Sequence, residues 1–129
     1  MKIIFLIFLI PLIQSENSEI ANRIFEKFRE LAYAGNFKTA KTLLAPNFEI
    51  RWFGVGSTPD KYLKDLQHNQ FRTKFLEAQL QTSENSEVVL IYDVDDGRLK
   101  YKLELRCLID ESSGDGRIHF IKTRAVKKF

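Results

Sequence analysis

The second half of the chain carries four β-strand patterns separated by short turn signals, and this arrangement limits the fold more than any other feature. The predicted strands cover residues 71–82, 88–95, 98–110 and 117–126. The Asp-Gly pair at 96–97 is typical of a two-residue hairpin turn. Strands joined by short turns pair antiparallel with their neighbours in the chain. The sequence therefore predicts an antiparallel meander of four long strands.

The first half of the chain carries the helices that must cover this sheet. Apolar residues recur at helical spacing from about position 17, and Gly35 is placed to end that helix with a left-handed cap. A second short helix is predicted over 37–44, a half-buried strand over 48–52, and a third helix from the Thr-Pro pair at 58–59. A twisted antiparallel sheet must bury one face. We therefore expect an α+β fold in which a curved antiparallel meander wraps around N-terminal helices as a cone.

The N-terminus has the pattern of a secretory signal peptide. Lys2 supplies a positive charge, residues 3–13 are almost entirely apolar, and charged residues begin at Glu16. The apolar run is shorter than the about 20 residues that a membrane-spanning helix needs. We therefore predict a signal peptide over 1–15, a single domain over 16–129, a secreted, extracellular protein and no stable membrane insertion. A retained N-terminal membrane anchor is the alternative.

Composition argues against several classes of protein. A lone cysteine, Cys107, excludes a domain stapled by disulfides, and its place in an alternating strand is typical of a small buried hydrophobe. The formal charge of +3 is spread without a basic stripe, so no nucleic acid partner is expected. The two histidines, His68 and His119, lie far apart without further ligands at metal spacing. We therefore expect no metal and no cofactor.

Two short stretches and the order of the elements carry a family resemblance. The stretches are residues 31–37 running into 43–48, and the loop over 55–59. With the predicted elements, they resemble the nuclear-transport-factor-2-like superfamily, which includes ketosteroid isomerases, scytalone dehydratase and polyketide cyclases. The resemblance covers most of residues 18–126. It implies a cone whose open end holds a hydrophobic pocket, and members often dimerise through the sheet.

This resemblance also implies that the isomerase chemistry is absent. Isomerases of the superfamily use a carboxylate near the end of the first strand and a tyrosine on the first helix. The matching positions here are Phe53 and Phe28, and the only acid between Asn47 and Pro59 is Glu49. Phenylalanine neither carries a proton nor donates a hydrogen bond. We therefore expect an apparently non-catalytic member, with no catalytic residue at these positions.

Aromatic side chains are the candidates for a ligand pocket. We expect an apolar ligand to contact five of them: Phe28, Trp52, Phe53, Tyr92 and Tyr101. The alternative is that these side chains simply fill the cone, because a small domain with one core needs bulky residues.

Three functions are open at this point. The first is a secreted, non-catalytic domain that binds a small apolar ligand or a protein partner. The second is a small secreted enzyme of the isomerase or dehydratase type, with a relocated site around His119 and either Tyr101 or Tyr92. The third is a homodimer through the sheet. Its surface would consist of apolar residues on the face opposite Tyr92: Val89, Ile91 and Leu108. A His119 side chain that points into the cone would favour the enzyme, and one that points outward would favour the binding domain.

Overall fold

Three helices and six strands make up the part of the chain described by the computed structural model. It describes residues 2–110 and 112–125, with side chains described from Glu16 onward. The helices are α1 (Lys2–Tyr33), α2 (Phe37–Lys41) and α3 (Pro59–His68). The strands are β1 (Leu44–Trp52), β2 (Val55–Ser57), β3 (Lys74–Glu84), β4 (Glu87–Asp95), β5 (Lys100–Asp110) and β6 (Asp115–Ala125).

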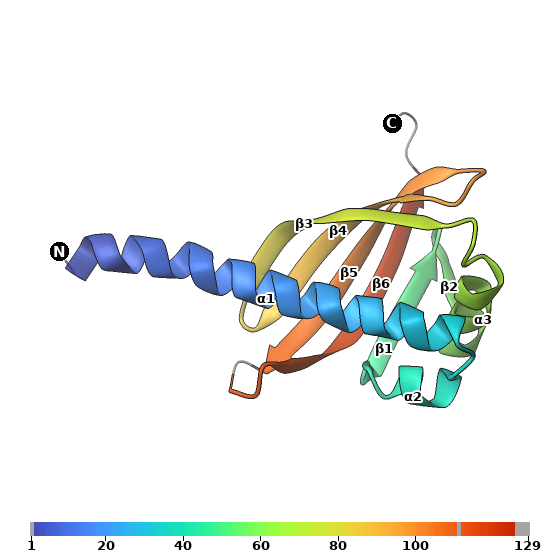
Figure 1. Cartoon of the computed structure of the whole chain (residues 1–129), viewed down its shortest axis with the longest axis horizontal. Coiled ribbons are helices and arrows are strands. Elements are labelled where there is room, and N and C mark those ends of the chain that lie inside the picture. Colours follow the sequence, from blue (N-terminus) through green and yellow to red (C-terminus); the bar gives the residue numbers. More distant parts are fainter. Residues whose placement is uncertain (1, 111, 126–129) are drawn as a thin grey trace.

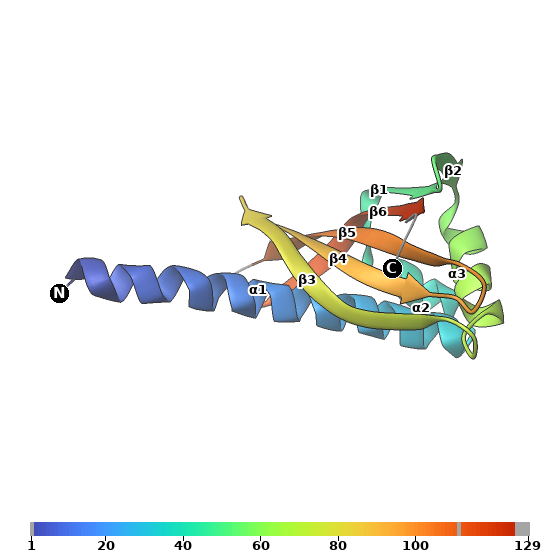
Figure 2. The same ribbon diagram turned by 90° about the horizontal axis from the view of Figure 1, so that it is seen from above.

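All six strands form one sheet in the order β2-β1-β6-β5-β4-β3. The strands β3 to β6 pair antiparallel in sequence order, so the predicted meander is confirmed. The strand β1 joins the other edge of β6 in parallel, and β2 pairs antiparallel with β1. The sheet is curved and unclosed, and α1 lies across its concave face (Figures 1 and 2). The predicted α+β class and the sheet wrapped around N-terminal helices are confirmed.

Two boundaries differ from the expected ones around the second helix. The helix α2 ends at Lys41, and β1 begins already at Leu44, where a strand from residue 48 was expected. Leu44 pairs with Ile118, and the regular pairing resumes only at Glu49. Pro46 lies inside this interruption, where its missing N–H costs no ladder hydrogen bond. A proline therefore sits inside an irregular strand.

The first helix begins earlier than expected, since α1 runs without a break from Lys2, not from about residue 17. The residues before 16 contain no Gly, and Pro11 is the one residue among them that would be expected to interrupt a helix. Whether residues 1–15 are removed as a signal peptide stays a prediction. Within the described residues, no helix is long and apolar enough to cross a membrane.

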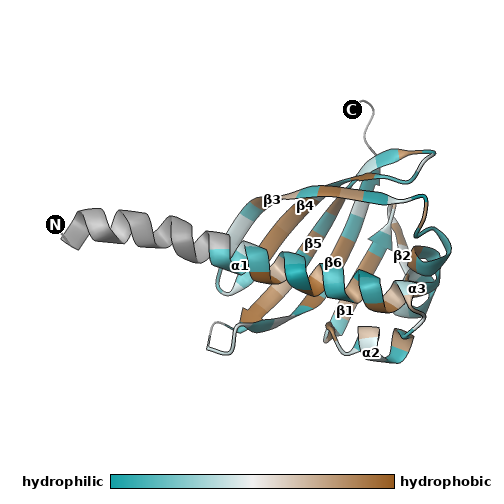
Figure 3. Cartoon of the chain, viewed as in Figure 1, coloured by the Kyte–Doolittle hydropathy of each residue, from teal (hydrophilic) through white to brown (hydrophobic). Residues whose placement is uncertain are grey.

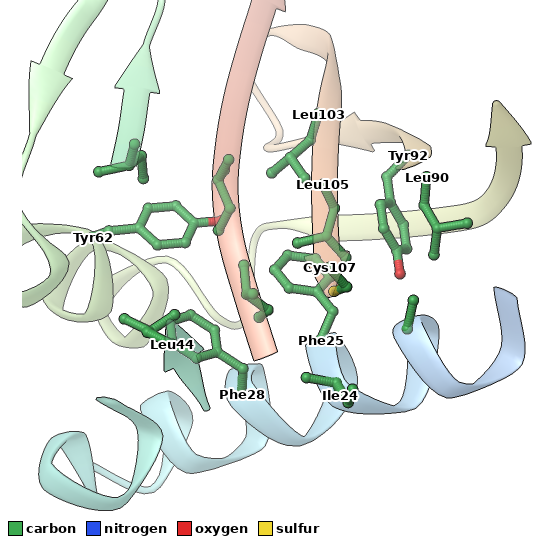
Figure 4. Packing of buried hydrophobic residues seen from close by; sticks show 14 of the residues in the cluster. Ile24, Phe25, Phe28, Leu44, Tyr62, Leu90, Tyr92, Leu103, Leu105 and Cys107 are labelled. Atoms are coloured by element: carbon green, nitrogen blue, oxygen red, sulfur yellow. The ribbon is translucent and has the colours of Figure 1, made fainter. Parts of the chain in front are cut away.

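The core lies between α1 and the concave face of the sheet. Five small or apolar side chains of α1 are buried against it: Ala21, Ile24, Phe25, Phe28 and Ala32. The inward residues of β4 and β5 meet them, and these two strands carry the strongest apolar colour in Figure 3. Figure 4 shows Phe25 and Phe28 pointing from α1 toward the strands. The helix is therefore held to the sheet by large apolar side chains.

Cys107 belongs to this core, as the alternation of its strand predicts. The side chain is fully buried and free of a disulfide. Burial raises the pKa of the Cys107 thiol to about 12. Because the thiolate is the reactive form, the thiol is inert at neutral pH and acts as a small hydrophobe.

Candidate functional site

Two of the five predicted ligand-binding aromatics belong to the packed core. Phe28 is 0% exposed and stacks between Phe25, at 6.4 Å between ring centroids, and Tyr62, at 6.3 Å. Tyr92 lies 5.1 Å from Phe25, and its hydroxyl donates a 2.6 Å hydrogen bond to Oδ1 of Asn22 on α1. Phe28 fills the space between α1 and the sheet, whereas Tyr92 also lines a hollow of about 300 Å³ between α1 and β3.

The other three predicted residues gather at the end of the cone where β1 ends and β5 begins. The Trp52 ring lies 5.2 Å from Phe53 and 5.6 Å from Tyr101, and Phe53 lies 5.4 Å from Tyr101. All three pairs pack edge to face, which is a favourable arrangement for aromatic rings. The structure therefore brings Trp52, Phe53 and Tyr101 into one cluster.

A hollow of about 200 Å³ opens beside this cluster, and we call it the mouth hollow. Its walls include four aromatic rings and two carboxylates: Trp52, Tyr62, Phe75, Tyr101, Asp65 and Asp96. A neighbouring hollow of about 290 Å³ shares the Trp52, Tyr62 and Asp65 walls. A ligand in the mouth hollow therefore has room to extend along β2.

Local sequence signals place these walls. The Thr58 hydroxyl accepts a hydrogen bond from the Lys61 N–H and caps α3, and Pro59 follows at the first helical position, as predicted. The spacing of three residues between Tyr62 and Asp65 puts both on one face of α3. The helix cap therefore sets where the aromatic and the acidic wall of the hollow lie.

A left-handed turn follows Trp52, which is the last residue of β1 and a wall of the mouth hollow. Phe53 has φ 51 and Gly54 has φ 85, so two successive residues are left-handed. The Phe53 N–H donates a 2.9 Å hydrogen bond to the hydroxyl of the buried Thr123. A bulky residue in this backbone region is uncommon, and such outliers cluster at functional sites. This strain supports the end of β1 as part of a site.

The tyrosine hydroxyls around the hollow stay protonated at neutral pH. Burial and the nearby Asp96 carboxylate raise the pKa of Tyr101, and burial and then Tyr101 raise that of Tyr62. The Tyr62 hydroxyl points from α3 toward the sheet (Figure 4) and, among the described residues, has no hydrogen-bond partner. Both groups can donate a hydrogen bond, but neither is poised to take up a proton as a base.

His119 lies on the outer face of the sheet, away from the cone interior. Its Nε2 is 2.6 Å from Oε2 of Glu87, an ion pair when the imidazole is protonated. The neighbouring Ile118 pairs with Cys107 and points inward. Tyr101 and Tyr92 point to the opposite face, so the structure does not bring His119 together with either of them. The described residues contain no cluster of three His, Cys, Asp or Glu that could hold a metal ion.

The outer face of β4, β5 and β6 is partly apolar. Val89 is only 5% exposed without belonging to the core cluster, and Leu108 beside it is 42% exposed. Arg106 stacks over Phe120 and pairs with Glu104, a carboxylate that is almost buried on this face. These contacts join apolar and charged side chains across three strands.

The largest of the described hollows, about 440 Å³, lies at the other end of the sheet, beside the β5–β6 turn. Its walls include Pro46, Leu108 and two exposed carboxylates, Asp110 and Asp115, and no aromatic ring. Asp110 already accepts hydrogen bonds from the Ser112 N–H and hydroxyl. This shallow hollow lacks the converging groups of the mouth hollow.

Comparison with known proteins identifies the fold. No family model and no curated protein matches the sequence. Among solved structures, the chain is similar to an NTF2-like protein with a cystatin-like fold from Novosphingobium aromaticivorans, at a TM-score of 0.66 and 10% identity, over 95% of this chain and 90% of that one. It is also similar to an NTF2-like protein of unknown function in nutrient uptake from Rhodospirillum rubrum (TM-score 0.62, 14% identity, 82% and 98% of the chains). A third similar structure is a protein from Shewanella frigidimarina provisionally assigned as a ketosteroid isomerase. Its TM-score is 0.60 and its sequence identity 13%, over 81% of this chain and 94% of that one.

These likenesses give the class of the protein: the chain has the NTF2-like fold, and the predicted resemblance to the nuclear-transport-factor-2-like superfamily is confirmed at the level of the fold. At sequence identities of 10–14%, these similarities establish the fold but do not assign an activity.

Four of the six aromatic and acidic wall residues were missed from the sequence as site residues: Tyr62, Asp65, Phe75 and Asp96. Asp96 was expected only as part of a hairpin turn, and the other three had no expected role in a site. The available signal was the spacing of Tyr62 and Asp65 on one helix face, close in sequence to Trp52.

Proposed function

We propose that this chain is a secreted, non-catalytic protein that binds a small ligand in the mouth hollow. The observation that carries the proposal is a hollow with four aromatic walls at one end of the cone, whereas the hollow of about 300 Å³ between α1 and β3 has two, Phe75 and Tyr92. Trp52 and Tyr101 are the two predicted ligand-binding residues that line it. Ligand sites of proteins are concave, largely aromatic and equipped with a few polar groups. Secretion rests on the sequence pattern of residues 1–15.

The absence of catalysis is supported by the side chains at the positions where isomerases carry their chemistry. Phe53 and Phe28 occupy these positions and pack against other rings. His119, the centre of the alternative enzyme hypothesis, lies on the outer face with Glu87. Neither arrangement offers a base beside the mouth hollow, and we assign the Asp65 and Asp96 carboxylates in its walls to ligand binding.

Native mass spectrometry of the protein secreted from eukaryotic cells tests this proposal. We expect a chain cleaved near residue 15 that carries a bound small molecule. Trp52 is the only tryptophan and lines the hollow, so its fluorescence reports occupation directly. Trp52→Leu should remove the adduct, whereas Leu76→Ala, in the hollow between α1 and β3, should keep it. An uncleaved chain contradicts secretion, and an adduct that survives Trp52→Leu contradicts this site.

We also propose a homodimer through the outer face of the sheet. Its apolar residues are Val89, Ile91 and Leu108, of which Val89 is already only 5% exposed in the monomer and Leu108 is exposed beside the Arg106–Phe120 pair. Leu108→Lys should convert a dimer to a monomer, because a lysine in the interface loses hydration that Glu87, opposite it on β4, offsets only in part. Leu99→Lys is the matched control, since Leu99 is equally 42% exposed but lies outside this face. Sedimentation equilibrium decides: a wild-type monomer at micromolar concentration contradicts the dimer.

A further inference from the structure

We infer that the mouth hollow selects a small organic cation, namely an ammonium group joined to an apolar group. The inference rests on the proposed ligand binding in this hollow and deepens it by naming the chemical class of the ligand. The sequence predicted an apolar ligand. The two carboxylates in the walls favour a ligand that also carries a positive charge.

Two carboxylates from separate elements line the hollow. Asp65 comes from α3, and Asp96 comes from the turn between β4 and β5. Oδ1 of Asp96 accepts hydrogen bonds from the N–H groups of Arg98 and Leu99, at 2.9 and 2.7 Å, so the turn holds this carboxylate in place. Among the described residues that line the hollow, none is Lys or Arg. The hollow is therefore acidic in a chain whose formal charge is +3.

Three positive groups lie near the hollow, and two of them contact its wall residues Asn69 and Phe75, but none of the three lines it. Arg72 donates a 2.7 Å hydrogen bond to Oδ1 of Asn69, and its side chain passes close to Gly97. Arg29 lies 4.3 Å over the Phe75 ring and lines the separate hollow between α1 and β3. Lys61 lines the neighbouring hollow along β2. None of these three cations lies over the ring of Trp52 or Tyr101 in the described contacts, so both rings are available to a ligand.

Aromatic faces beside carboxylates are a recognised arrangement for binding a cation. A ring face attracts a positive charge within about 6 Å of its centroid, and tryptophan does so most strongly. Trp52 and Tyr101 lie 5.6 Å apart at an interplanar angle of 73°, so they present two differently oriented walls to one guest. The two carboxylates add an electrostatic attraction, which water screens in part at the half-buried Asp96 and more strongly at the exposed Asp65. An ammonium group meets both kinds of wall at once.

Two exposed apolar side chains come from segments that border the hollow, and they suit the rest of such a ligand. Phe71 is 96% exposed in the turn between Asn69 and Thr73, and both of these residues line the mouth hollow. Val55, 69% exposed, lines the neighbouring hollow. Large exposed apolar residues near a hollow are typical of a binding surface. An apolar group attached to the ammonium can rest on this rim.

A series of three compounds of similar size tests the inference: phenethylamine, phenethyl alcohol and phenylacetate. Trp52 fluorescence and calorimetry measure their affinities for the mature protein. We expect the amine to bind at least ~10-fold more tightly than the alcohol, and the carboxylate not to bind. Asp65→Asn with Asp96→Asn should abolish the preference for the amine. Asparagine keeps the shape of both side chains and the acceptor of the Asp96 turn.

The control variant is Asp93→Asn, which removes a carboxylate that pairs with Lys102 outside the mouth hollow. It should leave the ~10-fold preference for the amine unchanged, because Asp93 does not line the hollow. Equal affinities for the amine and the alcohol would overturn the cation inference while supporting a site at Trp52. If no compound binds and Trp52 emission stays constant, both the inference and the proposed function fail.

Discussion

Replacing Phe28 by alanine is expected to lower the free energy of unfolding by about 3–5 kcal/mol. The ring is 0% exposed and lies between the rings of Phe25 and Tyr62, so its removal leaves a cavity that its neighbours cannot fill. A domain of this size has a total stability of about 5–15 kcal/mol, and the variant would therefore lose a large part of it. Urea unfolding followed by circular dichroism measures the change.

Phe71→Ala is the matched control for this experiment, because it removes the same ring from a side chain that is 96% exposed. Its free energy of unfolding should change by less than about 0.5 kcal/mol. A loss below about 1 kcal/mol in Phe28→Ala would mean that the ring borders open space. The predicted role of Phe28 as a pocket wall would then regain support over its role in the core.

The sequence predicts the elements well where neighbours in the chain also meet in space. The meander from β3 to β6 follows from turn signals, and the caps at Gly35 and Thr58 are local. The parallel pairing of β1 with β6 joins residues about 70 positions apart, such as Ile50 and Ile121, and no local pattern specifies it. Non-local pairing is therefore where the sequence-based prediction of this fold stops.

The side chains that form the mouth hollow illustrate the same limit. Trp52, Asp65 and Asp96 come from three elements that meet only when the sheet curves around α1. Alternation along a strand shows that Tyr92 and Tyr101 share the inward face, but not that Tyr92 lies against Phe25 while Tyr101 borders a hollow. Depth within the cone depends on the position along the strand relative to the helices, which periodicity alone does not give.

The face of His119 was undetermined for a different reason. Side chains two positions apart on a strand share a face, so the buried Ile121 predicts that His119 points into the cone. Adjacent side chains lie on opposite faces, so the buried Ile118 predicts that His119 points outward. The pairing between β5 and β6 shifts between Arg106 and Cys107, and this bulge turns both Ile118 and Ile121 inward. A single extra residue therefore decides that His119 meets Glu87 and not Tyr101.

Gly116→Ala is expected to lower the free energy of unfolding by about 1–3 kcal/mol, because the strand has no room for a methyl group at this position. A Cβ on Gly116 would lie 2.5 Å from the carbonyl oxygen of Leu108 on β5, and 2.9 Å from Cδ1 of Ile109. It would also come within 3.1 Å of Cδ1 of Ile24 on α1. Since the first of these atoms belongs to the backbone, β5 and β6 must separate locally to accept the methyl group.

Gly56→Ala on β2 is the matched control, because no heavy atom lies within 4 Å of the Cβ that it adds. Its stability should stay the same or rise by up to about 1 kcal/mol, since alanine restricts the unfolded chain. Both variants should be compared in urea unfolding of the mature chain. A neutral Gly116→Ala would contradict the close approach of α1 to the start of β6, and with it the packing that holds the cone around its helix. A loss confined to Gly116→Ala would support the close packing of β5 against the start of β6.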